Sequence, residues 1–279
     1  DDATVANAAE RGDMALVRSL LDGGADVNVP QVDGMTALHW AVFHDDVATS
    51  RLLVTSGADV GKANRYGVPP LSVAATNANA DIVTLLLEGG ANANTALRGG
   101  ETVLMTAART GSLGAVRALL AHGADPNAVE QRNQTALMWA AAEGHASVAH
   151  ALLETGADLD VRLKSGFTPL FFAVREGHID VVHTLLEAGA NLEEVLQRVK
   201  DGPDRAVNNA SYRPVDDGIS PLIMAIRNGH FELAVALVHA GSDPNDLRSG
   251  FAPLHTMSWV RKPDESDRGD PAPIGSGNL

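Results

Sequence analysis

The chain has 279 residues, of which 45% are hydrophobic and 20% are charged, a content that excludes a wholly disordered protein. Its 35 acidic and 21 basic side chains give a net charge of −14 at pH 7, which argues against attraction to nucleic acid or to an anionic membrane. No apolar run approaches the roughly 18–20 residues of a membrane-spanning helix, and the absence of cysteine excludes disulfides, thiol nucleophiles and Cys-ligated zinc.

Two short phrases recur along the chain with the same period. The first is a tetrapeptide such as Thr36-Ala37-Leu38-His39, and its next four copies follow at intervals of 33 residues. Its copies begin at Thr36, Pro69, Thr102, Thr135, Thr168, Ser220 and Ala252. The second phrase, Gly-Ala-Asp or Gly-Ala-Asn, keeps the same period from Gly24 to Gly189. Self-similarity at a fixed period predicts a repeat architecture.

Each repeat predicts two short helices. Thr or Ser caps the first helix, Pro suits its first position, and glycine closes its end in five repeats, at Gly12, Gly111, Gly144, Gly177 and Gly229. The second helix carries paired leucines such as Leu119-Leu120, and a turn rich in Asn and Asp leads into the next repeat. Neither helix is long enough to be stable alone in water. The tetrapeptide leucines therefore predict one core column, formed by Leu38, Leu71, Leu104, Leu137, Leu170, Leu222 and Leu254.

On these motifs the chain resembles the ankyrin-repeat family over roughly residues 1–260. The resemblance implies an all-α repeat solenoid of stacked helix–turn–helix units with finger turns, about seven complete repeats plus a partial one. It assigns the array to residues 1–261, with an insertion at roughly 192–217, and leaves 262–279 as a Pro/Gly/Asp-rich tail or a truncated inserted loop. The units are 1–33, 34–66, 67–99, 100–132, 133–165, 166–217, 218–249 and a partial unit from 250.

The repeats depart from the family pattern in three ways. The tetrapeptide His, which in the family ties a loop by a hydrogen bond, remains only at His39 and His255, so this bond is in doubt elsewhere. Asp45 and Ala78 replace the helix-ending glycine, and we expect distorted turns there. Helical spacing in the insertion predicts a short helix and a projecting loop, with a tolerated surface insertion as the alternative. The residues with this spacing are Leu192, Val195, Leu196 and Val199.

Metal and catalytic sites find little support. His145, His178 and His230 recur once per repeat, and at about 8–10 Å per repeat they are too far apart to share one metal ion. The run from Asp264 to Asp270 lacks the regular alternation and the closing Glu of a calcium-binding hand. No Gly-rich phosphate loop and no nucleophile–base pair has local support. We therefore expect no enzyme activity, no cofactor and no bound metal.

One set of side chains suggests a binding surface. The resemblance implies that finger residues and the last turns of the first helices line the concave face. Eight cations and two aromatic neighbours fall there: Arg65, Tyr66, Arg98, Arg109, Arg132, Lys164, Phe167, Arg175, Arg227 and Arg248. One interpretation is a solvated face whose charges pair among themselves, with Glu101, Glu143 and Glu176 nearby. The other is a basic trough that holds an acidic segment of a partner.

The tail offers a segment of that chemistry within the chain itself. Its carboxylates complement the cations of the last repeats, so we expect the tail to lie against this face or against that of a neighbouring copy. The carboxylates are Asp264, Glu265, Asp267 and Asp270. Packing on the exposed end of the stack, or a crystal contact, is the alternative.

The leading hypothesis is a non-enzymatic scaffold that binds another protein on the concave and finger face. The alternative is the non-catalytic ankyrin portion of a larger multidomain enzyme or regulator. We expect no nucleic-acid binding and no membrane insertion, and a monomer or weak self-association. The first residue, Asp1, and the absence of Cys slightly favour a bacterial exported or periplasmic protein over a cytoplasmic one. The incomplete last unit predicts further repeats beyond Leu279.

Overall fold

The computed structural model describes residues 4–196, 218–250 and 252–260. In this part of the chain it contains fifteen helices, and no strand beyond one isolated bridge between Ala96 and Thr102. The helices are α1 (Val5–Glu10), α2 (Met14–Asp22), α3 (Ala37–Phe43), α4 (Val47–Thr55), α5 (Pro70–Thr76), α6 (Ala80–Glu88), α7 (Val103–Arg109), α8 (Leu113–Ala121), α9 (Ala136–Glu143), α10 (Ala146–Glu154), α11 (Pro169–Glu176), α12 (Ile179–Glu187), α13 (Pro221–Arg227), α14 (Phe231–His239) and α15 (Pro253–Val260). Seven helix pairs followed by α15 confirm the predicted all-α repeat solenoid.

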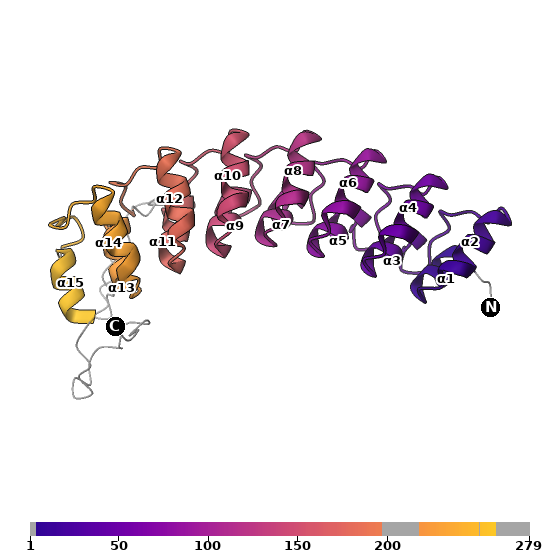
Figure 1. Ribbon diagram of the computed structural model, residues 1–279, viewed down its shortest axis with the longest axis horizontal. Helices are drawn as coiled ribbons and strands as arrows, with labels where there is room; N and C mark the ends of the chain where they lie inside the picture. The colour runs from indigo at the N-terminus through magenta and orange to yellow at the C-terminus, as the bar shows by residue number, and fades with distance from the viewer. Residues whose placement is uncertain (1–3, 197–217, 251, 261–279) are drawn as a thin grey trace, which may run out of the picture. The chain divides into compact units, whose positions relative to one another are not determined.

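The helices belong to two compact units. The first comprises Asp1–Gln131, Thr135–Trp139 and Ala151–Ala157, and the second comprises Arg132–Gln134, Ala140–His150 and Asp158–Leu279. Within the first unit, the pairs from α1–α2 to α7–α8 stack side by side (Figure 1). Within the second unit, α11 packs on α13 and α13 packs on α15, so first helices again lie beside first helices.

Side-chain caps begin the first helices as the tetrapeptides predict. The Thr168 hydroxyl accepts the N–H of Phe171, and Pro169 occupies the first helical position, where its missing N–H leaves no intrahelical bond unmade. The same side-chain cap is made by Thr36, Thr102 and Ser220. In these repeats the start of the first helix is fixed by the repeat's own sequence, whereas α5 has Pro69 at its N-cap and no side-chain cap.

The core is the leucine column that the repeats predict, with one exception. Leu38, Leu104 and Leu170 are at most 2% exposed, and burial of each such side chain contributes about 1.5–3 kcal/mol. Leu254 is 73% exposed, so its predicted place in the column is wrong. In the preceding repeat α14 packs against α13, whereas no second helix follows α15 in the described part of the chain. None of the described helices is long and apolar enough to span a bilayer.

The turns after the first helices are the same with and without glycine. Gly177 has φ 81°, and Asp45 and Ala78 adopt the same left-handed conformation with φ 60° and 59°. The closing backbone bond is also kept, because the N–H of Asp46 donates to the Ala41 carbonyl over 2.9 Å. The expected distortion of these turns is therefore wrong. The backbone is unchanged, and the cost is a non-glycine residue at positive φ.

The residue that covers each turn explains where a side chain is tolerated. His178 and His230 lie directly over Gly144 and Gly177, and a Cβ at Gly177 would lie 2.6 Å from Nδ1 of His230. Over Asp45 the following repeat carries Asn79, whose Nδ2 donates to the Asp45 carboxylate over 2.9 Å. An imidazole above the turn therefore requires glycine, whereas a smaller polar residue leaves room for a Cβ.

Neighbouring fingers are joined in some places and not in others. The N–H of Arg65 donates to the Asp33 carbonyl over 3.0 Å, and the N–H of Gln131 donates to the Gly99 carbonyl over 2.9 Å. Between the fingers at 64–68 and 97–101, both fully described, there is no hydrogen bond. A Cβ at Gly67 would have nothing within 4 Å. This junction is open on its finger side.

Asparagines bridge the repeats at the base of the fingers. The Nδ2 of Asn28 donates to the Gly57 carbonyl over 3.0 Å, and its Oδ1 accepts the N–H of Asp59 over 2.7 Å. Asn94 makes the same two bonds with its following repeat. Gly61 stands at the equivalent position of the second repeat and has no side chain to make them.

The root of the insertion is extended rather than helical. Leu192 and Glu193 form a turn, and the N–H of Leu196 donates to the Ile219 carbonyl over 2.9 Å, while the N–H of Gly218 donates back to the Leu196 carbonyl over 2.8 Å. The predicted helix is therefore wrong up to residue 196, because the two backbone hydrogen bonds to Gly218 and Ile219 hold this segment extended. The rest of the insertion, residues 197–217, and the predictions about the tail lie outside the described residues.

Candidate functional site

Within each unit the fingers and the last turns of the first helices meet at a surface, which we call the finger face of that unit. In the first unit, Arg109 at the end of α7 lies 3.4 Å from the Glu101 carboxylate and 5.7 Å from the ring centre of Trp139. In the second unit, Arg175 at the end of α11 lies 5.3 Å from the ring centre of Phe167 in the preceding finger. The sequence positions assigned to this face are therefore brought together in each unit.

The finger face of the first unit carries exposed cations. The Arg65 guanidinium donates to the Tyr66 hydroxyl over 2.7 Å and lies 4.9 Å from the centre of that ring. This hydrogen bond raises the pKa of Arg65 above its already high ordinary value. Arg98 is exposed, and within the part of the chain that the structure describes it makes no ion pair. Both charges are available to a ligand.

In the second unit, two of the predicted cations form ion pairs with carboxylates of the same unit. Arg175 donates to Glu176 over 2.7 Å. Arg248 donates to Asp246 over 2.8 Å and to Glu193 over 2.9 Å. These contacts raise the pKa of Arg248, and the hydrogen bond from Arg248 lowers the pKa of Asp246. Three further predicted cations are exposed at their finger or late-helix positions: Arg132, Lys164 and Arg227.

A buried carboxylate ties the sixth repeat to the root of the insertion. Glu194 is 6% exposed; its Oε1 accepts the Thr168 hydroxyl over 2.5 Å and its Oε2 accepts Arg162 over 2.8 Å. Burial raises the pKa of Glu194, and the two hydrogen bonds oppose this without cancelling it. Sequence reasoning missed Glu194, because its partner Thr168 lies 26 residues earlier and no local spacing links them.

The second repeat makes the corresponding tie with histidine, as the tetrapeptide predicts. Nδ1 of His39 accepts the N–H of Thr36 over 3.2 Å, and its Nε2–H donates to the Val68 carbonyl of the next finger over 3.1 Å. Burial lowers the pKa of His39. A neutral imidazole with its proton on Nε2 satisfies both bonds.

The histidines that recur after the helix-ending glycines serve packing. The Nε2–H of His178 donates to the Ala142 carbonyl over 3.0 Å, and that of His230 donates to the Arg175 carbonyl over 2.9 Å. Each ring therefore binds the open end of the preceding first helix. In the described residues, no group of three His, Cys, Asp or Glu side chains is placed to hold a metal ion.

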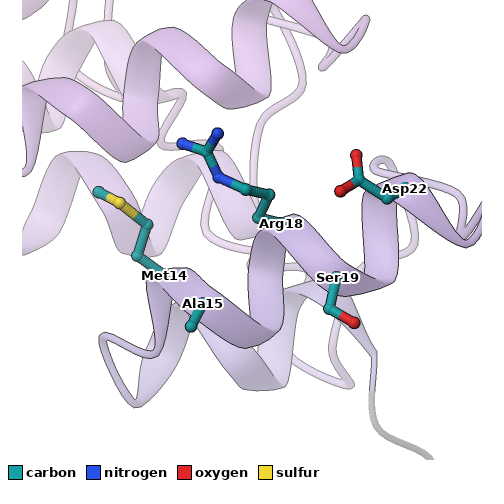
Figure 2. A pocket seen from close by; sticks show the side chains of 5 residues that line it. All are labelled: Met14, Ala15, Arg18, Ser19 and Asp22. Atoms are coloured by element: carbon teal, nitrogen blue, oxygen red, sulfur yellow. The ribbon is translucent and has the colours of Figure 1, made fainter.

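A pocket on α2 has the wrong construction for an active site. Figure 2 shows its five lining side chains, which all come from that single helix: Met14, Ala15, Arg18, Ser19 and Asp22. One helix cannot enclose a substrate on several sides, as ligand pockets do.

Comparison with known proteins gives a consistent answer. A family model of three ankyrin repeats matches residues 5–96, 51–130 and 104–195, and a single-repeat model matches 217–248. Among solved structures, the human ASB11 ankyrin repeat domain is similar, with 26% sequence identity and a TM-score of 0.68 over 86% of this chain and 98% of that one. No curated protein sequence matches the chain.

Proposed function

The chain belongs to the ankyrin-repeat family, and from this premise we propose that it is a non-enzymatic scaffold that binds a partner protein on its finger face. Ankyrin repeats are in general protein–protein interaction modules, and ankyrin-repeat domains are typically non-catalytic. The observation that carries the proposal is the meeting of fingers and first helices at one exposed surface, as in the contact of Arg175 with Phe167.

An acidic segment of the partner fits this surface. Arg65 and Arg98 are exposed on neighbouring fingers of the first unit, on a chain whose net charge is −14. Exposed charge pairs contribute only about 0–1 kcal/mol each, so several must act together. The interaction is therefore expected to weaken as the ionic strength rises.

The test compares two triple charge reversals that change the net charge equally. One set lies on the finger face and consists of Arg65→Glu, Arg98→Glu and Arg109→Glu. The control set lies on the second helices and consists of Arg18→Glu, Arg51→Glu and Arg117→Glu, all exposed. Each full-length protein is immobilised and used to capture proteins from a lysate of the source cells.

Proteins retained by the wild type and by the control triple, and lost with the finger-face triple, support the proposal. Capture that is equal for all three proteins, or lost equally with both triples, contradicts it. An unchanged thermal unfolding midpoint in both triples ensures that a lost partner reflects the surface and not the fold.

A further inference from the structure

Large apolar side chains are exposed at finger and late first-helix positions of the first two repeats. Val32 is 99% exposed, Phe43 is 58% exposed and Tyr66 is 59% exposed. We refer to these three side chains and the half-buried Trp40, which contacts Phe43, as the apolar patch. Exposed apolar groups in one place mark binding surfaces more often than scattered ones do.

The patch is held in place before any ligand binds. The Nε1–H of Trp40 donates to Gln31, which precedes Val32, over 2.7 Å. The ring of Phe43 stands edge-on to Trp40 with centres 5.8 Å apart, and lies 5.6 Å from the ring of His44. Fixed aromatic rings lose little side-chain entropy on binding, so they are efficient anchors.

Cations border the patch on the side of the following fingers. Arg65 lies across the Tyr66 ring at 4.9 Å, which holds its charge at the edge of the apolar surface. Only part of its guanidinium is engaged by the Tyr66 hydroxyl, so further donors remain for a carboxylate. Arg98 occupies the same position on the next finger.

Two positions that recur in each repeat change from apolar to cationic along the first unit. The finger position reads Val32, Arg65 and Arg98, and the late first-helix position reads Phe43, Thr76 and Arg109. Both series begin with an apolar side chain and end with a cation. A ligand that lies along the fingers therefore meets an apolar surface first and positive charge after it.

We propose that the apolar patch anchors a partner segment that carries one aromatic or long aliphatic residue, followed on one side by carboxylates that face Arg65 and Arg98. The inference rests on the proposed function and names the chemistry of its partner. Neighbouring repeats lie about 8–10 Å apart, and an extended chain advances about 3.3–3.6 Å per residue. The two carboxylates are therefore expected about three residues apart.

The probe is a displayed library of random 16-residue peptides, selected on the immobilised full-length chain at low salt. Enriched peptides are synthesised, and their affinities are measured for the wild type, Phe43→Ala and Tyr66→Ala. Two matched controls remove exposed apolar side chains from the second helix α14, in Val235→Ala and Val238→Ala, which are 52% and 37% exposed in the wild type. The triple reversals described above are measured in parallel.

We expect the enriched peptides to combine an apolar anchor with carboxylates, and to lose at least tenfold in affinity in Phe43→Ala or Tyr66→Ala but not in the controls. Acidic peptides that lack an anchor and bind Phe43→Ala as tightly as the wild type would overturn the inference and leave the proposed function standing. If the peptide affinities change neither in Phe43→Ala nor in the finger-face triple, or if no peptide is enriched, both the inference and the proposed function are overturned.

Discussion

The second and sixth repeats form the same turn after the first helix with different residues. In the second, Asp45 stands at φ 60° below Asn79, which donates to its carboxylate. In the sixth, Gly177 stands at φ 81° below the ring of His230. The backbone bond that closes the turn is 2.9 Å long in both, from Asp46 to Ala41 and from His178 to Ala173.

The two repeats also secure their first helices with different chemistry. His39 links Thr36 to the next finger as a neutral imidazole, whereas Glu194 reaches back from the following finger to Thr168 as a carboxylate. In both cases the residue that binds the cap also binds a neighbouring repeat, through the Val68 carbonyl for His39 and through Arg162 for Glu194. The residue that fits a given turn or cap therefore depends on the neighbouring repeat, and the sequence of one repeat alone does not show which residue that is.

The largest expected effect comes from closing the space over the sixth turn. Gly177→Ala places a Cβ 2.6 Å from His230 at positive φ, so overpacking of about 1–3 kcal/mol adds to backbone strain of about 1–2 kcal/mol. We expect the free energy of unfolding to fall by about 2–5 kcal/mol in urea titrations.

Gly12→Ala is the matched control for Gly177→Ala. Gly12 has φ 68° with nothing within 4 Å of a built Cβ, so only the strain of about 1–2 kcal/mol is expected. Combining Gly177→Ala with His230→Ala should recover the steric part as a favourable coupling energy. Equal losses at Gly12 and Gly177 would contradict the pairing of imidazole with glycine.

The buried carboxylate of the sixth repeat is expected to have the next largest effect. Glu194→Ala leaves the Thr168 hydroxyl and Arg162 without their shared acceptor, at a cost of about 1–3 kcal/mol in the free energy of unfolding. Urea unfolding measures this loss, and Glu187→Ala, which removes an exposed carboxylate at the end of α12, is the comparison variant.

Glu194→Gln isolates the charge of this group. Burial raises the pKa of Glu194 in the folded state above its ordinary value of 4.5, so the folded state holds the proton more tightly than the unfolded state. The contribution of Glu194 to stability is therefore full below pH 4.5 and declines as the pH rises through the raised value. We therefore expect the free energy of unfolding of the wild type, relative to that of Glu194→Gln, to decrease as the pH rises from 4 to 8 in urea unfolding experiments. A difference that does not depend on pH would contradict a role for the charge of Glu194.

A smaller and opposite change is expected at the third turn. Ala78 has φ 59° and is exposed, so Ala78→Gly relieves backbone strain without opening a buried cavity. The gain is partly offset by the greater chain entropy of glycine in the unfolded state, which leaves about 0.5–1 kcal/mol of stabilisation. A urea midpoint that moves down instead would show that the turn is not strained.

The smallest effect is the pH response of the second repeat. Burial lowers the pKa of His39 in the folded state, so its contribution is full above the ordinary value of 6.5 and is lost as the pH falls through 6.5 towards the lowered value. His39→Ser installs the residue found at the same position of the third repeat, Ser72. The variant should show a shallower loss of stability between pH 7.5 and pH 5.5, measured by urea unfolding.

Much of the fold could be predicted because the relevant signals are local and repeat. The caps at Thr36 and Thr168 and the turn at Gly177 need only a few neighbouring residues. The distortion expected at Asp45 was wrong because the residue that decides it, Asn79, lies 34 positions away. Leu254 was misplaced because its burial depends on a helix that does not follow α15 within the described chain.

The candidate site was predictable in position but not in energetics. The sequence placed Arg109 and Arg175 beside the fingers, where they lie. It did not tell which cations find partners on the chain itself, because Arg248 pairs with Glu193 across 55 positions and the root of an insertion. The repeat period puts Phe43 at the same late first-helix position as Arg109 and Arg175, and its side chain is exposed there.

The open junction between the second and third fingers has a mechanical consequence. Neither a finger-to-finger hydrogen bond nor an asparagine bridge crosses it in the described chain, since Gly61 replaces the asparagine there, although α3 still packs on α5. Resistance to bending is therefore lower on the finger side of this junction than at the joined fingers on either side of it, with the helices acting as the pivot. The junction falls between Tyr66 and Arg98, so a ligand that spans both can adjust the distance between its two contacts by a small change in curvature at little energetic cost.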